Sequence, residues 1–253
     1  MTSVPGTHQE VLSSVLELGP GIRVAVSSRA GGVSGPPYDF LNLGAGVGDD
    51  RAAVAANRER LAAACDLPGT SLAWMRQVHG TNVCYIPAGS AGPDEPADAM
   101  YTDVPGLALC VLVADCVPVL VADPGAGLVG AAHAGREGMA AGVVPALVSA
   151  LTSAGAEPAR MRAHIGPGIC GACYEVPADM RARVATVVPA AGCTTRAGTP
   201  GLDIAAGVGA QLLDAGIGTV TADGRCTRES GELYSYRRDG TTGRFAGLVW
   251  LMP

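Results

Sequence analysis

Short apolar runs rich in β-branched residues recur along the chain, and their length is typical of buried strands rather than of helices. They predict strands at residues 22–28, 83–86, 107–113, 118–123, 127–133, 162–166 and 245–252. The connections between the runs at 107–113, 118–123 and 127–133 are too short for a crossover helix, so we expect these three strands to be antiparallel or to meander. The sheet should therefore be mixed rather than doubly wound.

Helical patterning is found in three other stretches, residues 51–64, 136–154 and 203–215. Asp49-Asp50 and Asp203 can cap the first and the third helix, because short polar side chains accept hydrogen bonds from the first free amides. Gly155 and Gly216 are placed to end the second and the third helix. Pro145 is expected to kink the second.

Strands and helices are interspersed, which indicates the α/β or α+β class. A length of 253 residues suits one domain spanning residues 1–253, with residues 1–20 as an N-terminal extension. Two stretches rich in Pro, Gly and polar residues, 87–98 and 190–201, are expected to be surface loops.

The composition excludes several classes of protein. With 48% hydrophobic and 16% charged residues the chain is not disordered, and no run of some twenty apolar residues indicates a membrane span. The N-terminus lacks the pattern of a signal peptide. The net charge is −6 without a long Lys/Arg cluster, so neither a nucleic acid nor an anionic membrane is an expected partner. We expect a cytoplasmic monomer acting on small molecules.

The cysteines fit a reducing compartment. There are eight, scattered among apolar segments of a large chain without a signal, so free thiols are expected rather than disulfides. Most should pack as small hydrophobic residues. Cys170-x-x-Cys173 has the spacing of a redox pair or of half a zinc site, but neither a second CxxC nor a thioredoxin-like setting accompanies it.

Three apolar stretches each end in a side chain that can bind a metal ion. The stretches are "WMRQVHG", "VADCVP" and "GAAHAGREG", and the side chains are His79, Cys116 and His133. Catalytic zinc sites commonly use three protein ligands and leave a fourth position open, and the thiolate also suits copper. The spacing matches no local zinc-finger pattern, so the fold would have to bring the three together.

The same residues allow two other interpretations. Cys116 and His133 can form a thiolate–imidazolium pair, with Asp115 orienting the imidazole and no metal involved. A Cys in an apolar strand is also more often a packing residue than a ligand, and a His before Gly a turn residue. A glycine lies close after each His, which lets the backbone approach closely and favours a site.

Two further segments carry arginines beside glycines, a setting that suits a phosphate or carboxylate ligand. One is "SSRAGGVSGPPYDFLNLG", with Arg29 and Asn42, and the other is "YSYRRDGTTGR". A solvated hairpin face is an equally good interpretation of Arg237 and Arg238, since exposed charges contribute little energy.

Seven segments together resemble, in order, the YfiH-like proteins, which are also called the DUF152, laccase-domain or polyphenol oxidoreductase family. This family includes the purine nucleoside phosphorylases related to human laccase domain-containing protein 1. The segments are "RAGGVSGPPYDFLNLGAGVGDD", "NRERL", "QVHG", "ADCVPVL", "AAHAGREG", "IGPGI…CYEV" and "YSYRRDGTTGR". The likeness extends from about residue 23 to residue 252.

The resemblance implies a single α/β domain of layered mixed sheets flanked by helices, with zinc held by His79, Cys116 and His133. It also implies phosphorolysis of adenosine, inosine and S-methyl-5′-thioadenosine to a free base and a ribose 1-phosphate product, with adenosine deamination as a further activity. For some bacterial members it implies removal of wrongly incorporated residues from peptidoglycan precursors.

Our hypothesis is therefore a zinc-dependent purine nucleoside phosphorylase, with copper as the other candidate metal. Arg29 would clamp phosphate, Asn42 would hold ribose or phosphate, and Gln77 and Tyr174 would complete the substrate site. Asp115 would orient His133 or act on the substrate.

Two alternatives remain open, a precursor-editing hydrolase that uses the metal or Cys116, and a metal-stabilised binding module. A multicopper laccase needs more imidazoles than His8 and His164 would add. Arg136 stands where the family most often has Trp, and Leu233 where an aromatic residue is more common, so base stacking should differ from the family's usual pattern.

Overall fold

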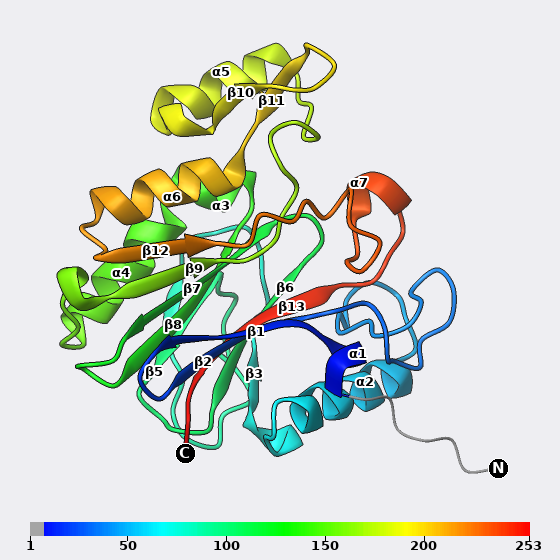
Figure 1. The fold of residues 1–253 in the computed structure, drawn as a ribbon, viewed down its shortest axis with the longest axis vertical. Helices are drawn as coiled ribbons and strands as arrows, with labels where there is room; N and C mark the ends of the chain where they lie inside the picture. The colour runs from blue at the N-terminus through cyan, green and yellow to red at the C-terminus, as the bar shows by residue number, and fades with distance from the viewer. Residues whose placement is uncertain (1–7) are drawn as a thin grey trace.

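Two large β-sheets pack face to face in the computed structural model, which describes residues 8–253 (Figure 1). The five-stranded sheet has the order β1-β2-β13-β6-β3, and the six-stranded sheet has the order β12-β9-β7-β8-β5-β4. The first sheet consists of β1 (Leu12–Gly19), β2 (Ile22–Ser27), β13 (Phe245–Leu251), β6 (Ala108–Val113) and β3 (Leu72–Trp74). The second consists of β12 (Thr219–Ala222), β9 (Arg162–Ile165), β7 (Val117–Asp123), β8 (Leu128–Ala134), β5 (Ala99–Thr102) and β4 (Val83–Tyr85). A separate ribbon is formed by β10 (Gly192–Thr194) and β11 (Pro200–Leu202).

Helices cover the outer faces of the two sheets, and α5 lies at one end of the molecule beside the β10–β11 ribbon (Figure 1). They are α1 (His8–Val11), α2 (Arg51–Ala64), α3 (Arg136–Ala141), α4 (Val143–Ser153), α5 (Ala178–Val187), α6 (Ile204–Asp214) and α7 (Tyr236–Asp239). Short 3-10 turns occupy Gly69–Ser71, Pro158–Arg160 and Pro189–Ala191. Among residues 8–253, no helix is both long and apolar enough to span a bilayer.

The apolar runs are continuous because the central strands are buried on both faces. In β7, Leu120 points into the core between the sheets, whereas Val119 and Val121 pack against the helices on the far side. In β6, Leu109 faces the core between the sheets and Cys110 the layer beneath α2. A strand with two buried faces loses the alternation of polar and apolar residues. The resulting layers are helix, sheet, sheet and helix, as expected for layered mixed sheets flanked by helices.

All the predicted strands are present, with ends displaced by no more than one residue. The predicted antiparallel pairing is confirmed for β7 and β8, but the pairing expected between 107–113 and 118–123 is wrong. β6 pairs with β13 and β3 in one sheet, and β7 pairs with β8 and β9 in the other. Residues 114–116 therefore form a corner between the two sheets rather than a hairpin turn.

The predicted helices are also present, but the second is divided differently. Asp50 and Asp203 cap α2 and α6 as expected, each accepting backbone N–H bonds in the first turn. The break in the second helix lies at Gly142, whose left-handed backbone (φ 94°) ends α3 and precedes α4. Pro145 lies in the first turn of α4, where its missing N–H would have had no helical partner, so it introduces no kink.

Several elements were not predicted. The extension expected at residues 1–20 contains β1, which pairs antiparallel with β2, so its described part is an edge strand of the five-stranded sheet; residues 1–7 lie outside the described residues. The first six residues of β1 include no buried position, so the strand lacks a continuous apolar pattern. α5 buries only Val184 completely, and a helix with so narrow an apolar face gives a weak periodic signal.

Asp123, the last residue of β7, is a buried carboxylate that organises two loops. It accepts hydrogen bonds from the N–H groups of Gly125 (2.8 Å), Ala126 (3.2 Å) and Glu157 (2.8 Å) and from the Arg160 guanidinium (3.3 Å). Burial alone would raise the pKa of Asp123, but the Glu157 N–H and Arg160 outweigh it, and the pKa lies below its usual range.

Asp123→Asn is expected to lower the free energy of unfolding at pH 7 by roughly 1–3 kcal/mol. The NH2 group of the new amide would face N–H groups that now donate to the carboxylate, so at least one of these donors would lose its acceptor. Because the pKa of Asp123 is lower in the folded than in the unfolded state, its carboxylate stabilises the fold fully at pH values above the unfolded pKa. This contribution is lost as the pH falls through the folded pKa. Urea unfolding at pH 7 and near pH 3 measures this. The difference between the wild type and the variant should shrink at the lower pH, and an equal difference at both pH values would contradict the assignment.

Candidate metal centre

Three predicted ligands meet where the chain passes from one sheet to the other. His79 lies on the connection from β3 to β4, Cys116 follows β6 at the corner into β7, and His133 lies in β8. Because β3 and β6 are parallel neighbours, the chain leaves both at the same sheet edge and crosses to the second sheet there. The long-range convergence is therefore a consequence of topology and not of spacing.

The ligand atoms of His79, Cys116 and His133 all lie within 4.8 Å of one another. Cys116 Sγ is 3.8 Å from His79 Nε2, and the two imidazole rings pack edge to face with centroids 4.8 Å apart. Burial decreases from His133, which is buried, through Cys116 to His79, which is exposed. The group is therefore held from within the protein and open on one side.

Asp98 fixes both histidines. Its Oδ1 lies 2.8 Å from His133 Nδ1 and accepts the His79 N–H at 2.9 Å, while Oδ2 accepts the N–H groups of Val78 (3.0 Å) and Gly80 (2.7 Å). The carboxylate directs Nε2 of His133 toward the other two ligands, as carboxylates behind metal-bound histidines commonly do. It also stabilises the left-handed backbone of His79 (φ 62°).

Gly135 is required for the close approach of the ligands. A Cβ atom built at this residue would lie 2.7 Å from Cδ2 of His79 and 3.0 Å from Sγ of Cys116. The backbone of the segment after His133 can therefore pack directly against the other two ligands. This is the close approach that the glycine after the HA dipeptide predicts.

Burial keeps the inner ligands neutral. It lowers the pKa of His133, against the opposing effect of Asp98, and it raises the pKa of Cys116 to about 12, with the Asp115 carboxylate adding to the rise. A thiolate–imidazolium pair between Cys116 and His133 is disfavoured by these shifts. A metal cation reverses them, because it binds neutral imidazole and stabilises thiolate.

The donor set fits one zinc or copper ion. Two imidazoles and one thiolate with a free side match a catalytic zinc site, and the same set also suits copper. His164 is buried in β9, where its Nδ1 lies 3.0 Å from Thr221 Oγ1, and the side chain of His8 lies outside the described residues. Among side chains described in residues 10–253, His79 and His133 are the imidazoles in this cluster.

Two cavities open onto the cluster and share part of their walls. Cavity A has a volume of about 390 Å³ and is lined by His79, Ala114, Asp115, Cys116, Gly135, Arg136, Ile169, Tyr174, Ile204, Tyr236, Arg237 and Arg244. Cavity B has a volume of about 470 Å³ and is lined by Gly44, Ala45, Gly46, Val47, Arg58, Met75, Arg76, Gln77, His79, Leu112, Val113, Ala114, Cys116, His133 and Arg244. His79, Cys116 and Arg244 thus stand between the two.

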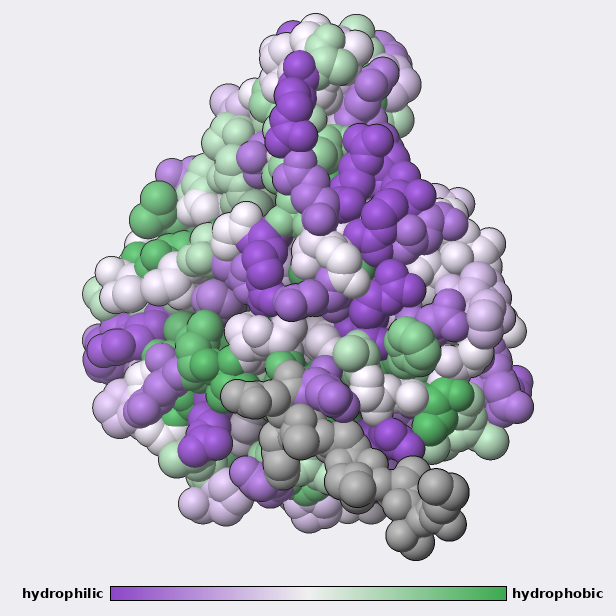
Figure 2. Space-filling view, turned by 45° about the vertical axis from the view of Figure 1, so that its right-hand side comes forward, coloured by the Kyte–Doolittle hydropathy of each residue, from purple (hydrophilic) through white to green (hydrophobic). Residues whose placement is uncertain are grey.

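The cavities differ in chemistry. Cavity A combines Tyr174, whose ring stacks under the Arg237 guanidinium at 4.9 Å, with Ile169 and Ile204. Each cavity is lined by three arginines, but cavity A also has the Asp115 carboxylate, whereas the described lining of cavity B has no carboxylate. Figure 2 shows a band of hydrophilic residues running from the α5 end of the molecule toward the α7 segment. Cavity A is thus suited to a planar ring, and cavity B to an anion.

The structure places Arg29 away from the cluster. Its guanidinium donates to the Asp39 carbonyl (3.3 Å), lies 3.8 Å from the Asp239 carboxylate and packs over the Tyr234 ring. It lines a different pocket, with Glu10 among that pocket's walls. The structure therefore does not bring Arg29 to the cluster but uses it to join the segment before α2 to the α7 segment, and its role as a phosphate clamp stays a prediction.

Asn42 is buried, and its amide is used internally. Oδ1 accepts the N–H groups of Gly44 (2.9 Å) and Arg244 (2.9 Å), and Nδ2 donates to Asp49 (2.8 Å). A direct contact of Asn42 with ribose or phosphate stays a prediction, and the internal hydrogen bonds leave its amide little to offer a ligand. Asn42 instead positions Arg244, which does line both cavities.

Gln77 and Tyr174 both line a cavity, but in different ways. Both amide atoms of Gln77 are bound to the backbone of Leu112, at 2.8 and 2.9 Å, so Gln77 shapes the wall of cavity B. Tyr174 presents its ring to cavity A. Arg136 also lines cavity A, and Leu233 is fully buried between the sheets.

Asp115 does not orient His133. Its carboxylate accepts the Thr227 hydroxyl (2.6 Å) and the Arg237 N–H (2.8 Å). It thereby joins the corner after β6 to the first turn of α7, while lining cavity A. The expected role as the carboxylate behind His133 belongs to Asp98.

Two residues of the site were missed in the sequence. Asp98 ends a loop rich in acids and lies directly before the buried strand β5; an acid flanked by an apolar strand was the available signal. Arg244 was one of three arginines in "YSYRRDGTTGR", and the sequence alone did not separate it from Arg237 and Arg238. Burial lowers the pKa of Arg244, although Cys116 and Asp115 nearby act in the opposite direction.

Comparison with known proteins finds relatives that match nearly the whole chain. A family model described as "Multi-copper polyphenol oxidoreductase laccase" matches residues 23–252. The chain is 54% identical over 229 residues to "Purine nucleoside phosphorylase ORF3" of Streptomyces griseus, covering 90% of this chain and 93% of that protein. It is 49% identical over 230 residues to "Purine nucleoside phosphorylase Rv2149c" of Mycobacterium tuberculosis, covering 91% and 92%.

Solved structures with the same fold cover nearly the whole chain. The DUF152 protein NMB0706 of Neisseria meningitidis superposes with a TM-score of 0.85 at 33% identity, covering 96% of this chain and all of that one. YlmD of Geobacillus stearothermophilus superposes with a TM-score of 0.84 at 32% identity, covering 92% and 93%.

Proposed function

The chain belongs to the multi-copper polyphenol oxidoreductase laccase family, which includes the YfiH and DUF152 proteins, and from that premise we propose that it is a metal-dependent purine nucleoside phosphorylase. The observation that carries the proposal is the place of Arg244, beside the His79–Cys116–His133 cluster and between cavity A, which has tyrosines in its wall, and cavity B, whose described lining has arginines and no carboxylate. Proteins named purine nucleoside phosphorylase with up to 54% identity to this chain support it.

Phosphate is proposed to bind in cavity B. Arg244 and Arg76 line it, together with Arg58, which donates to the Leu43 carbonyl and stacks 4.1 Å from the centroid of Trp74. A guanidinium that is already held in place can bind two phosphate oxygens without losing much further side-chain entropy. Arg244 is held in this way by bonds from its guanidinium to the carbonyls of Thr242 and Gly243 at 2.9 Å.

The nucleoside is proposed to bind in cavity A, with its base against Tyr174. The ring already stacks on Arg237, and Ile204 adds an apolar wall. Arg136 takes the place of the indole expected from the family, so hydrogen bonds to base oxygens or nitrogens replace part of the stacking. Inosine and adenosine, with S-methyl-5′-thioadenosine, are the proposed substrates.

In phosphorolysis a phosphate oxygen forms a bond to C1′ of the sugar while the C1′–N9 bond breaks. The base leaves with the bonding electron pair and takes up a proton. Arg244 lies where the two cavities meet, so it can hold phosphate toward C1′ and offset its charge during transfer. A bound zinc or copper ion would supply Lewis-acid chemistry at its open position.

Arg244→Met is expected to raise the KM for phosphate and to lower kcat/KM on the order of 10²-fold, a typical cost of losing one charge-stabilising donor. The measurement is initial rate at varied phosphate and fixed inosine. Arg244→Lys retains the charge without the bidentate geometry, so its phosphate KM and kcat/KM should lie between those of the wild type and Arg244→Met. Arg51→Met, at an exposed position of α2, is the control; equal phosphate KM values in all four proteins would contradict the placement of phosphate.

Tyr174→Ala is expected to raise the KM for inosine about tenfold, because base–aromatic stacking contributes roughly 1–3 kcal/mol. Tyr174→Phe retains the ring and should remain within about twofold of the wild type, since little of the stacking energy is lost. Steady-state kinetics with inosine at saturating phosphate measures both. A similar change in the two variants would place the base elsewhere.

The product decides between this proposal and its rivals. Inosine and phosphate are incubated with the protein, and the products are separated and identified by phosphorus NMR and chromatography. Phosphorolysis gives hypoxanthine and ribose 1-phosphate, and release of base without phosphate dependence would instead indicate a hydrolase. With adenosine, formation of inosine would reveal the proposed deaminase side activity.

Precursor editing and a metal-stabilised binding module remain the other functions to test. The thiol version of editing needs a reactive thiolate, whereas burial raises the pKa of Cys116 to about 12. A binding module needs no open ligand position. Metal bound without any phosphate-dependent base release would favour editing by the metal.

A further inference from the structure

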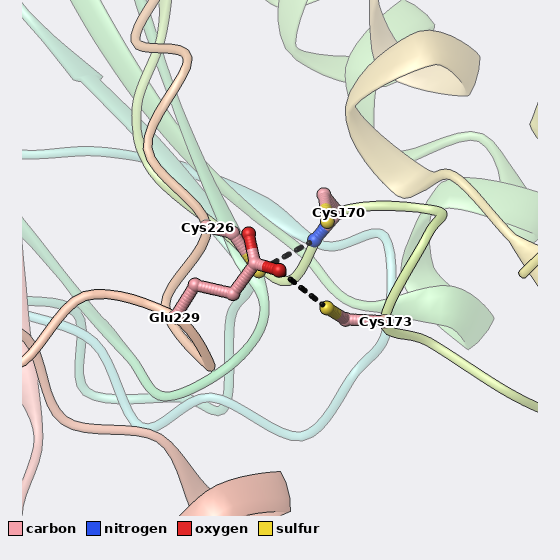
Figure 3. Close-up of side chains that lie close together, drawn as sticks. All are labelled: Cys170, Cys173, Cys226 and Glu229. Carbon is pink, nitrogen blue, oxygen red and sulfur yellow. Dashed lines mark hydrogen bonds between the residues drawn. The ribbon is translucent and has the colours of Figure 1, made fainter. Parts of the chain in front are cut away.

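A second group of soft ligands lies in the loops beyond cavity A. Figure 3 shows four side chains converging from two segments, one after β9 and one after β12. They are Cys170, Cys173, Cys226 and Glu229, and their ligand atoms all lie within 4.8 Å of one another. We propose that these four residues form a second metal site, which holds Zn²⁺ and stabilises the wall of cavity A.

Each segment supplies its two ligands from one tight turn. The Cys173 N–H donates to the Cys170 carbonyl at 2.9 Å, and the Glu229 N–H donates to the Cys226 carbonyl at 3.1 Å. Both turns therefore bring residues i and i+3 to the same side. Two ligand pairs of this spacing, facing each other, are typical of structural zinc sites.

The two turns are joined by the ligands themselves. The Cys170 N–H donates to Sγ of Cys226 at 3.4 Å, and Sγ of Cys173 lies 3.5 Å from Oε1 of Glu229. A backbone bond from Thr227 N–H to Gly168 O (3.0 Å) aligns the segments. The ligands are thus preorganised by contacts that do not depend on the ion.

Burial and access both suit a bound ion. Cys173 and Cys226 are buried and pack with Ile169 in a small apolar cluster. Cys173 and Glu229 also line a surface cavity of about 400 Å³, which provides a path for the ion. The carboxylate is at the exposed side of the group and the thiols are at its inner side.

Two arginines offset the charge of the ligand set. Three thiolates and one carboxylate carry four negative charges, and a dication leaves two of them. Arg196 pairs with Glu229 at 2.7 Å, and Arg228 donates to the Cys173 carbonyl at 3.3 Å. Their positive charge lowers the cost of gathering deprotonated ligands.

Zinc is favoured over a redox pair by the number of ligands. Three thiolates and a carboxylate complete a tetrahedral set, whereas one disulfide would leave the third thiol unused. All of these cysteines carry free thiols in the structure. A closed four-ligand set has no open position for substrate, so this ion would be structural.

The consequence for cavity A follows from the neighbouring residues. Tyr174 comes directly after Cys173 and lines the cavity, and Thr227 comes directly after Cys226 and donates to Asp115. An ion that joins the two turns would therefore fix the position of the tyrosine ring. This inference stands on its own ligands and does not depend on the reaction at the first cluster.

The test uses Cys116→Ser as the background, so that the first cluster cannot hold its ion. Metal content is measured by elemental analysis on purified Cys116→Ser, on Cys116→Ser/Cys173→Ser, and on Cys116→Ser/Cys193→Ser. Cys193 is the matched control, because it lies beside the same loop with Sγ 3.5 Å from the Gly171 carbonyl but belongs to neither cluster. We expect about one equivalent of zinc in the first and third proteins and none in the second.

A spectroscopic measurement covers the case in which Cys173→Ser fails to fold. Cobalt(II) replaces zinc in Cys116→Ser, where three thiolate ligands should give an intense near-ultraviolet charge-transfer band and tetrahedral visible bands. Absence of both zinc and these bands, zinc that persists without Cys173, or a disulfide within Cys170, Cys173 and Cys226 in freshly purified protein would each overturn the proposal.

Discussion

Asp98→Ala is expected to lower the free energy of unfolding by about 3 kcal/mol and to weaken metal binding about 10- to 100-fold. The substitution leaves four donors without an acceptor, namely His133 Nδ1 and the N–H groups of residues 78–80. A buried donor left unsatisfied, such as His133 Nδ1, costs about 1–3 kcal/mol, and the N–H groups of residues 78–80, which belong to exposed or half-buried residues, cost less. Loss of the carboxylate behind a ligating histidine commonly reduces metal affinity by the factor given. Urea unfolding and a competition titration with a chromophoric chelator measure the two effects.

Asp94→Ala is the matched control for Asp98, because it removes an exposed carboxylate from the same loop. It should change neither stability nor affinity. Asp98→Asn tests the charge separately. Its amide keeps one oxygen that can accept hydrogen bonds, but its NH2 group would face N–H groups that now donate to the carboxylate. If Asp98→Ala bound metal as tightly as Asp94→Ala, the carboxylate would not be positioning the histidines.

Cys116→Ser is expected to lower phosphorolysis by about 10³-fold or more. Serine is a poor ligand for a soft metal, and losing a Lewis acid worth several kcal/mol costs about tenfold per 1.36 kcal/mol. The fold should survive, because the change is nearly isosteric at a half-buried corner. Inosine phosphorolysis at saturating phosphate is the measurement, with Cys84→Ser, a half-buried thiol in β4, as the control.

A Cys116→Ser variant that had lost its metal but retained full phosphate-dependent activity would separate the reaction from the cluster. A variant that retained its metal and lost activity would favour Cys116 as a nucleophile. The raised pKa of the half-buried Cys116 thiol disfavours a free thiolate nucleophile.

The sequence predicted what depends on local pattern. The strand runs, the caps at Asp50 and Asp203, and the soft ligands at strand ends are each visible within a few residues. The partners of β6 were not predicted, because a connection of three residues can be either a hairpin turn within one sheet or a corner between two sheets. Sheet membership is decided by β13, about 130 residues later in the chain.

The site shows the same division. His79, Cys116 and His133 were picked out by their chemistry. The roles of Arg29 and Asn42 as substrate ligands stay predictions, because in this structure Asn42 binds the Arg244 N–H and Arg29 contacts Asp39 and Asp239. Asp98 and the Cys226–Glu229 turn were missed because each acts on residues far away in the sequence. Contacts between residues far apart in the sequence depend on the topology of the fold, which cannot be deduced from a single motif.

The most direct test measures metal content and phosphate-dependent hypoxanthine release on the same samples of wild type and His79→Ala. We predict that His79→Ala contains about one equivalent less metal per chain and releases hypoxanthine at least about 10³-fold more slowly, for the reason given for Cys116. Unchanged metal content would show that His79 is not a ligand, and loss of the metal with full activity would contradict a metal-dependent phosphorylase.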